Sequence, residues 1–365
     1  MKVLRSYSGS TMQIDVFLEP KQTAYGMANF VGLDTISVFD AKEHLKDIIP
    51  EKGRNLQIQA IVSDYVMKNA GVPTNVLGFK EPNIIQMELV RIPEKRNEAG
   101  LWGLPDGDVV DASQNCYLTD GEFIFRYLLN GDSSVVKKFN KGELTLEQLA
   151  WSKFPLTETW LEEPVFNVTH KFLKGDPYFD LSDNMAELKT SCGLIDSDIQ
   201  KIWHYMRVGN AALRGYVNSL GWQLVDGKNE VSVGPNRTIK FADFSLTQDG
   251  YRINVLIDGE TIKMNKQLVR DYEEWVNHDW FVDLNRCKKD KVPFSDWPDA
   301  PYLRREVSDV FAQMYKAFTA SYAQPVIGEL FDGKNPVSGA MSLTEIRDAL
   351  VPIKDEIAEC KKSYN

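Results

Sequence analysis

The sequence predicts an α+β protein with two lobes: an N-terminal antiparallel sheet lobe and a larger α/β lobe, followed by a C-terminal helical extension. Three observations lead to this fold class. Short runs of β-forming residues alternate with turn residues near the N-terminus. Two long segments later in the chain repeat apolar residues at helical spacing. Between them, an alternating run followed by a Gly-Pro-Asn turn predicts a hairpin.

The N-terminal lobe is expected to span residues 1–92. Strands are predicted at residues 11–18, 23–30, 34–39 and 83–92, where β-formers alternate or cluster between turn residues. Ile58, Ile61, Val62 and Tyr65 recur at helical spacing and predict a helix over residues 57–69, with Gly71 as its stop signal. We expect this helix to pack on the sheet.

The larger lobe is expected to span residues 93–322. Its first segment, 93–120, is rich in Gly, Asp, Asn and Pro and predicts a long loop before a strand at 121–129. Amphipathic helices are predicted at 196–220 and 304–322. The extension, 323–365, contains a helical pattern over 343–361, and the Ser342–Glu345 spacing there is that of a capping box.

Composition narrows the class of protein. The 365 residues are 43% hydrophobic and 26% charged, which is typical of a folded soluble protein. There is no run of about 18 apolar residues and no apolar N-terminal segment of the secretory type, so we expect a cytoplasmic protein with no membrane partner. The four cysteines are far apart without CxxC spacing, which argues against a zinc site and a disulfide framework.

The formal net charge of −10 would repel a nucleic-acid backbone, so binding to DNA or RNA is not favoured. A cleft in which several Lys and Arg side chains converge would still accept an anionic small molecule. The four histidines have no serine or cysteine nucleophile motif near them, and neither a GxxxxGK[ST] nor a GxGxxG segment is present. A bound nucleotide would therefore need another fold.

The hairpin is the most informative feature of the chain. If residues 224–230 form a strand, Asp226, Lys228 and Glu230 share one of its faces, because strand side chains alternate. Asp243, on the returning strand, would then approach Glu230 and create the oxygen-rich corner that Mg²⁺ prefers. A solvated strand face with a surface ion pair explains the same pattern about equally well.

Seven segments, taken in order, carry a family resemblance. They are YSGSTMQI (7–14), DTISVFD (34–40), IPEKG (49–53), the Arg126 and Gly131 region, PVFNVTHK (164–171), the hairpin with ADFSLTQDGYR (242–252), and NKQLVRD (265–271). This order resembles the phosphoribosylaminoimidazole-succinocarboxamide synthase (SAICAR synthetase) family over residues 5–320. The resemblance implies a two-lobed SAICAR synthetase-like fold with the active cleft between the lobes.

The implied function is that of an ATP-dependent ligase of de novo purine biosynthesis. Such an enzyme joins L-aspartate to carboxyaminoimidazole ribonucleotide and gives SAICAR, ADP and phosphate. The implied cofactors are ATP and Mg²⁺, the implied partners are the aminoimidazole ribotide, aspartate and ATP, and a homodimer is usual in the family. Phosphoryl transfer of this kind depends on positioning and electrostatics more than on a covalent nucleophile.

The resemblance also assigns candidate site residues. Those expected to take part in catalysis are Lys228, Asp226 and Arg252, and those expected to bind metal are Glu230 and Asp243. Those expected to bind substrate are Arg126, Gly131, Asp132, Ser133, Lys171, Asp249, Lys266, Arg270 and Asp40. Those expected to meet the nucleotide are Gly9, Ser10, Met12, Glu88, Arg91 and Glu230.

Several of these residues have an ordinary structural explanation. Lys266 and Arg270, four residues apart, would normally form a solvated helix face. Lys171 is as readily a surface lysine, and Glu88 and Arg91 are as readily cross-strand charges. The unpaired guanidinium of Arg126 in an apolar strand is costly, so we expect a ligand or a buried carboxylate beside it.

The sequence departs from the family pattern at functional positions. The family turn reads GKxR or GKxK, whereas Gly9 is followed here by Ser10, Thr11 and Met12. Asp132 replaces the serine of the family GS pair. Three hypotheses follow: a divergent synthase, which we favour, an ATP-dependent ligase or kinase of the same fold with another substrate, and a non-catalytic ribotide-binding homologue.

Overall fold

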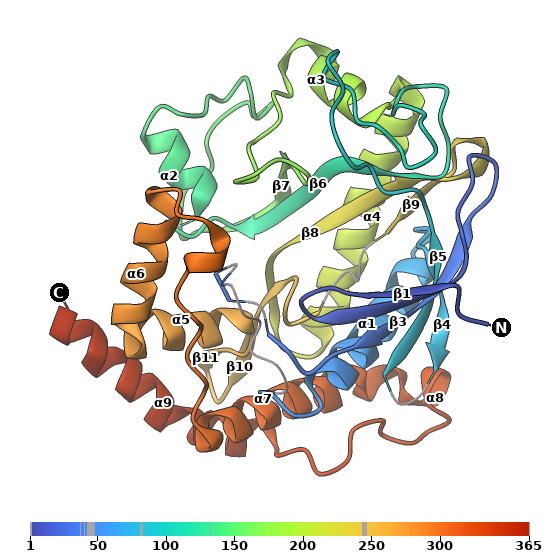
Figure 1. Ribbon diagram of the computed structural model, residues 1–365. Helices are drawn as coiled ribbons and strands as arrows, with labels where there is room; N and C mark the ends of the chain where they lie inside the picture. The colour runs from blue at the N-terminus through green and yellow to red at the C-terminus, as the bar shows by residue number, and fades with distance from the viewer. Residues whose placement is uncertain are drawn as a thin grey trace.

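The computed structural model describes residues 2–36, 38–39, 41, 48–80, 83–131, 133–242 and 247–364. Within these ranges the chain forms two antiparallel sheets with helices packed around them, which confirms the predicted mixture of helices and antiparallel sheets (Figure 1). None of the helices in the described ranges has an apolar stretch long enough to cross a bilayer.

The first sheet has the strand order β1-β2-β3-β5-β4. Its strands are β1 (Arg5–Ser8), β2 (Met12–Leu18), β3 (Gly26–Gly32), β4 (Val76–Lys80) and β5 (Ile84–Leu89). Helix α1 (Lys52–Asn69) packs against this sheet. Gly32 and Gly53 allow the helix start to approach β3, since a Cβ on Gly53 would lie 2.4 Å from the carbonyl carbon of Gly32.

In this lobe one predicted strand is wrong, and the predicted helix is confirmed with an earlier start. The described residues of 34–39 form no strand, because the Asp34 carboxylate instead accepts hydrogen bonds from the backbone N–H groups of Glu51 (3.0 Å) and Gly53 (2.9 Å). Helix α1 begins at Lys52, five residues before the expected start. Asp34 therefore fixes the turn that leads into α1.

The second sheet has the order β11-β10-β8-β6-β7, with β9 paired to β8. Its strands are β6 (Tyr117–Leu128), β7 (Trp160–His170), β8 (Gln223–Val233), β9 (Ile239–Phe241), β10 (Arg252–Ile257) and β11 (Glu260–Lys263). The predicted hairpin is confirmed as β8 and β9, which pair antiparallel with Ser232 opposite Lys240. Strand β6 starts four residues earlier than predicted, and β7, β10 and β11 were not predicted.

The long helices agree with the apolar patterns. Helices α4 (Asp196–Ser219), α7 (Arg305–Ala323) and α9 (Leu343–Tyr364) match the predicted segments to within a few residues. The capping box is confirmed, since the Ser342 N–H donates to Glu345 Oε2 (2.8 Å) and the Glu345 N–H donates to Ser342 Oγ (3.2 Å). The other helices are α2 (Ser134–Asn140), α3 (Ser182–Cys192), α5 (Lys266–Val276), α6 (His278–Lys289), α8 (Ile327–Leu330) and the 3₁₀ turns Pro235–Arg237, Phe294–Asp296 and Gln324–Val326.

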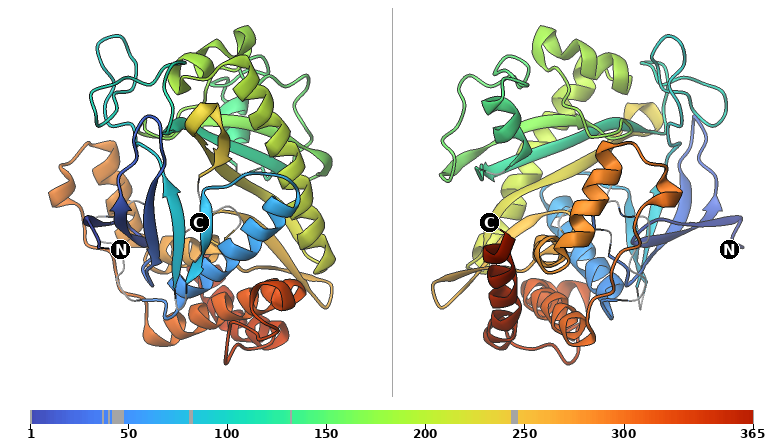
Figure 2. Two further views of the ribbon diagram at one scale, coloured as in Figure 1. Left: turned by 90° about the vertical axis from the view of Figure 1, so that its right-hand side faces the viewer. Right: turned by 60° about the vertical axis from the view of Figure 1, so that its left-hand side comes forward.

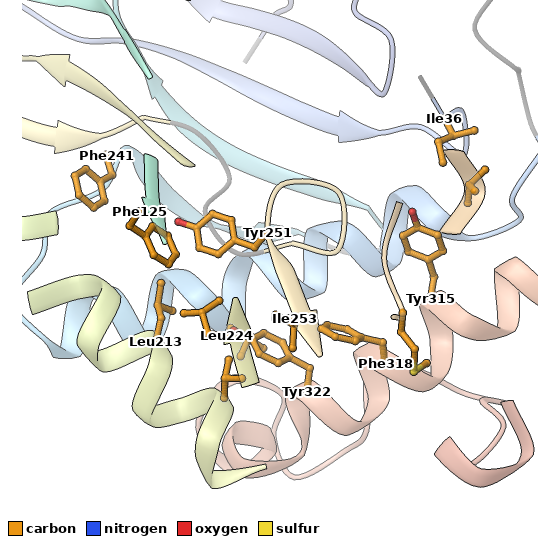
Figure 3. Close-up of a cluster of buried hydrophobic side chains, with 14 of the residues drawn as sticks. Ile36, Phe125, Leu213, Leu224, Phe241, Tyr251, Ile253, Tyr315, Phe318 and Tyr322 are labelled. Atoms are coloured by element: carbon orange, nitrogen blue, oxygen red, sulfur yellow. The ribbon is translucent and has the colours of Figure 1, made fainter. Parts of the chain in front are cut away.

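The largest hydrophobic cluster lies between the second sheet and the helices, and two smaller clusters pack beside the first sheet and around α2. Side chains of α4, α7, β8 and β10 converge in the largest cluster, among them Leu213, Leu224, Ile253, Phe318 and Tyr322 (Figure 3). Helix α7 lies along α1, and α9 packs against α7 and α5 (Figures 1 and 2). Ile346 and Leu350 of α9 are fully buried in the same core, so the extension shares the packing of the rest of the fold.

Candidate active site

A row of three charged residues crosses the centre of the second sheet. Asp226 on β8 lies opposite Arg126 on β6 and opposite Arg252 on β10. Its carboxylate accepts from Arg126 Nη1 (3.1 Å) and, in a bidentate arrangement, from Arg252 Nε (2.8 Å) and Nη2 (2.5 Å). Arg126 and Asp226 are each 5% exposed. The carboxylate partner expected for Arg126 is therefore Asp226, and it holds both guanidinium groups in place.

A second charged cluster follows along the same face of β8. Lys228 pairs with Glu122 of β6 and lies 3.7 Å from Glu230, while Glu230 pairs with Lys171, just after β7. The prediction that Asp226, Lys228 and Glu230 share a face is confirmed. The cluster alternates two ammonium and two carboxylate groups, so its charges are balanced within the protein.

Asp249 joins the sheet to the helices. Lys52 Nζ at the start of α1 lies 2.7 Å from Asp249 Oδ2, and Tyr315 on α7 donates a hydrogen bond to Oδ1 (2.6 Å). Lys52 is fully buried. Burial acts to raise the pKa of Asp249, but the attraction of Lys52 and Lys266 and these hydrogen bonds outweigh it and lower that pKa. Asp249 is therefore a carboxylate at neutral pH.

The loop that carries Asp249 is fixed by a pair of buried amides. Gln248 donates its backbone N–H to Gln59 Oε1 (2.8 Å), and Gln59 Nε2 donates to Gln248 Oε1 (2.7 Å). Gln59 also donates to Thr319 of α7 (2.7 Å). Helices α1 and α7 thus hold the loop through hydrogen bonds that leave few polar atoms of these side chains unsatisfied.

These elements surround a cavity of about 310 Å³. Seven predicted site residues line it, namely Arg126, Asp226, Lys228, Asp249, Arg252, Lys266 and Arg270. Lys266 and Arg270 reach it from the first turns of α5, which confirms their common helix face. Five of these side chains are cationic and two are acidic, so the cavity is locally positive in a chain with a net charge of −10.

A neighbouring cavity of about 260 Å³ opens toward the first sheet. Thr11 and Met12 of the glycine-containing turn line it together with Gly32, Gly53 and Gln57. Lys228, Asp249, Gly250 and Lys266 line both cavities, so the two spaces adjoin at these residues. Gly9 and Ser10 belong to the same turn. The Gly9 N–H donates to the Met12 carbonyl (2.7 Å), and the Thr35 hydroxyl donates to the Ser10 carbonyl (2.5 Å).

Other predicted residues lie outside both cavity linings. Arg91 is 3% exposed and binds Asp106 (2.7 Å) and Asp108 (3.1 Å) of the loop before β6, and Glu88 pairs with Lys240 of β9 (2.5 Å). The Gly131 N–H donates to the side chain of Glu158 (2.6 Å). Ser133 caps α2 by position, without a side-chain capping bond.

The predicted metal site lies partly beyond the described residues. Asp243 of the predicted metal pair lies outside the described ranges, as do the predicted substrate-binding residues Asp40 and Asp132. Within those ranges no group of three or more His, Cys, Asp or Glu side chains is placed to hold a metal ion. Glu230 is paired with Lys171. The described residues therefore do not form a magnesium site on their own.

Sequence reasoning missed two groups that hold the site together. Glu122 pairs with Lys228, and Tyr315 binds Asp249. Each lies more than sixty residues from its partner in the sequence. The one local signal for Glu122 is that it lies four residues before Arg126. Because strand side chains alternate, both side chains then lie on the same face of β6.

Comparisons with known proteins agree with this architecture. A family model described as SAICAR synthetase matches residues 22–287. The SAICAR synthase from Saccharomyces cerevisiae complexed with SAICAR is 15% identical, covering 88% of this chain and 95% of that chain, with a TM-score of 0.56. The phosphoribosylaminoimidazole-succinocarboxamide synthase from Ehrlichia chaffeensis is 15% identical, covering 80% and 100%, with a TM-score of 0.51.

A SAICAR synthetase solved in complex with ADP is 18% identical and covers 73% of this chain and 90% of that chain, with a TM-score of 0.51. At these identities the structural likeness shows a shared fold. No curated protein sequence matches the chain.

Proposed function

The chain belongs to the SAICAR synthetase family, and from this premise we propose that it is an ATP-dependent ligase of purine biosynthesis. It would join L-aspartate to carboxyaminoimidazole ribonucleotide, with release of ADP and phosphate. The observation that supports this most is the pair of adjoining cavities, one strongly cationic and one beside the glycine-containing turn, with Lys228 and Asp249 between them.

The cationic cavity suits a substrate that carries a phosphate and a carboxylate. Arg126 and Arg252 are held by Asp226, so their remaining N–H groups would meet an anion with little loss of side-chain entropy. Lys266 and Arg270 approach from α5 on the other side. Arginine suits bidentate contact with phosphate or carboxylate, which would fix the acceptor carboxylate for phosphorylation.

The neighbouring cavity would take the nucleotide. The glycine-containing turn and the start of α1 border it, and Lys228 and Lys266 reach it from the cationic cavity. Phosphates placed there would meet the acceptor beside Lys228, which would balance the charge of the transferred group. Mg²⁺ belongs to the proposal as the ion that accompanies ATP, with Glu230 and Asp243 the side chains proposed to meet it.

One observation favours a second candidate, a homologue that binds a ribotide without turning over ATP. The turn at Gly9 has no basic side chain, and Met12 lines the cavity where the family carries a cation. The related possibility of a ligase or kinase for another substrate rests on Asp132 and on Thr35, which stands where the family carries an arginine. Both functions are alternatives to the synthase. We propose that the synthase acts in the cytoplasm as a homodimer.

Omission assays distinguish these functions. ADP release is measured with ATP, Mg²⁺, the carboxylated ribotide and aspartate, and then with each component left out. We expect release that requires all four. Turnover without aspartate would reject the synthase in favour of another ligase or kinase. Thermal stabilisation by the ribotide with neither ADP release nor stabilisation by ATP would favour the binding protein.

A matched pair of variants links the activity to the cationic cavity. Arg270→Gln removes a lining cation, whereas Lys289→Gln on α6 removes an exposed cation outside the cavity. A lost charge-assisted contact of about 2–3 kcal/mol corresponds to roughly 30- to 150-fold in kcat/KM for the ribotide. Equal activities of the two variants would contradict the assignment of the ribotide to this cavity.

A further inference from the structure

A third cavity, unrelated to the candidate active site, lies between two hydrophobic clusters. One cluster surrounds α2 and includes Trp151, Phe154 and Leu161 as partly buried members, and the other is the main core, which Phe166 and Trp203 border. The cavity between them has a volume of about 730 Å³, which is within the range of small-molecule sites. It shares no lining residue with the two cavities of the site.

The walls of this cavity are aromatic and held in place. The Trp151 indole N–H donates to the Phe166 carbonyl (2.7 Å), and the Trp203 indole N–H donates to Met185 Sδ (3.4 Å). Both indole donors are thus satisfied within the protein, so the rings offer a ligand apolar surface rather than hydrogen bonds. Such a surface suits a flat apolar body, which aromatic rings contact over a large area.

The rim of the cavity is positively charged. Lys153 and Arg207 line it and are exposed, and neither has a carboxylate within 4.0 Å in the described part of the chain. Glu163 is the single acidic side chain among the lining residues. Two cations therefore face one acid at the mouth of an aromatic pocket, in a chain whose net charge is −10.

We propose that this cavity binds a flat aromatic molecule that carries a single negative charge. The ring system would enter between Trp151 and Trp203, and the anionic group would remain at the rim beside Arg207. Arginine suits both tasks, since its guanidinium pairs with an anion and stacks on aromatic faces. A neutral aromatic molecule would gain the ring contacts but would leave the cations without a partner.

The test compares two probes with the same ring system, 2-naphthoate and the neutral 2-naphthamide. Binding to the full chain is measured by calorimetry and by quenching of tryptophan fluorescence. We expect one naphthoate per chain, bound at least about 10-fold more tightly than naphthamide, with ADP and the ribotide unable to displace it. Equal affinities, displacement by either active-site ligand, or no binding at millimolar concentration would overturn the proposal.

Variants locate the binding. Arg207→Gln should reduce the preference for naphthoate to less than about 3-fold, whereas Lys201→Gln, an exposed cation on the same helix outside the cavity, should keep it. Trp151→Leu should weaken both probes and remove part of the fluorescence quenching. An unchanged preference in Arg207→Gln would contradict the placement of the anion. Because Arg207 is an exposed side chain, this variant is expected to fold normally.

Discussion

The buried pair of Lys52 and Asp249 gives the most quantitative prediction. At 2.7 Å, and with an effective dielectric constant of about 20, their attraction is about 6 kcal/mol. Much of this offsets the loss of hydration of a lysine with no exposed surface. Lys52→Met removes the attraction and leaves the Asp249 carboxylate without its nearest cation, so we expect the free energy of unfolding to fall by about 3–5 kcal/mol.

This loss can be measured as a melting temperature. With an unfolding entropy of about 2.1 cal/mol/K per residue, a chain of 365 residues should lose about 4–7 °C. Asp249→Asn should cost a similar amount, because it leaves the Lys52 ammonium buried and unpaired. The double variant Lys52→Met/Asp249→Asn contains neither charge, so we expect it to melt within about 3 °C of the unmodified protein.

The double variant tests whether Lys52 and Asp249 stabilise each other. If its loss equals the sum of the two single losses, the residues do not stabilise each other and the pairing argument is refuted. Tyr315→Phe provides an independent check, since it removes only the hydrogen bond to Asp249 Oδ1 and should cost about 1.5–3 kcal/mol.

Three further predictions concern stability. Burial raises the pKa of Glu273 to about 7, so its contribution to the free energy of unfolding is complete below pH 4.5 and is lost as the pH rises through 7. Glu273→Gln should remove about 3 kcal/mol of this pH dependence. The measurement compares melting temperatures at pH 5 and pH 8, with the exposed Glu306→Gln as the control. Arg91→Met should lower stability by about 3–5 kcal/mol without changing stabilisation by ADP, and a selective loss of the ADP effect would show that Arg91 meets the nucleotide. Ser342→Ala should cost about 0.5–2 kcal/mol through the lost capping box, and no change in melting temperature would mean that the start of α9 contributes nothing to stability.

The parts of the fold that could be predicted are those set by local periodicity. The shared face of Asp226, Lys228 and Glu230 follows from strand alternation alone, and the stripes of α4 and α7 follow from helical spacing. The prediction of a strand at 34–39 was wrong because the apolar residues there indicate buried positions rather than an extended strand. Ile36 and Val38 are 0% and 2% exposed, yet Asp34 turns the chain toward α1.

The contacts that complete the site could not be predicted, because they join distant parts of the chain. Lys52 of α1 meets Asp249 of the loop before β10, and Lys171 after β7 meets Glu230 of β8, so each pair forms only in the folded chain. The start of α1 could not be predicted from the sequence either, because its N-cap residue, Glu51, has a left-handed backbone (φ 61°) and makes no side-chain capping hydrogen bond. Arg91, predicted to meet the nucleotide, lies two residues after β5 and has its carboxylate partners in the following loop.

The row of Arg126, Asp226 and Arg252 has a consequence for motion. At Asp226, strand β8 pairs with β6 on one side and with β10 on the other, so the amide protons of this row exchange with solvent only when the sheet itself opens. Lys266 and Arg270 stand instead on the first turns of α5, whose amide protons we expect to exchange by local opening of the helix end, without opening of the sheet. We therefore expect slow amide hydrogen exchange in the wall of the cationic cavity formed by the sheet. We expect much faster exchange in the wall formed by the start of α5.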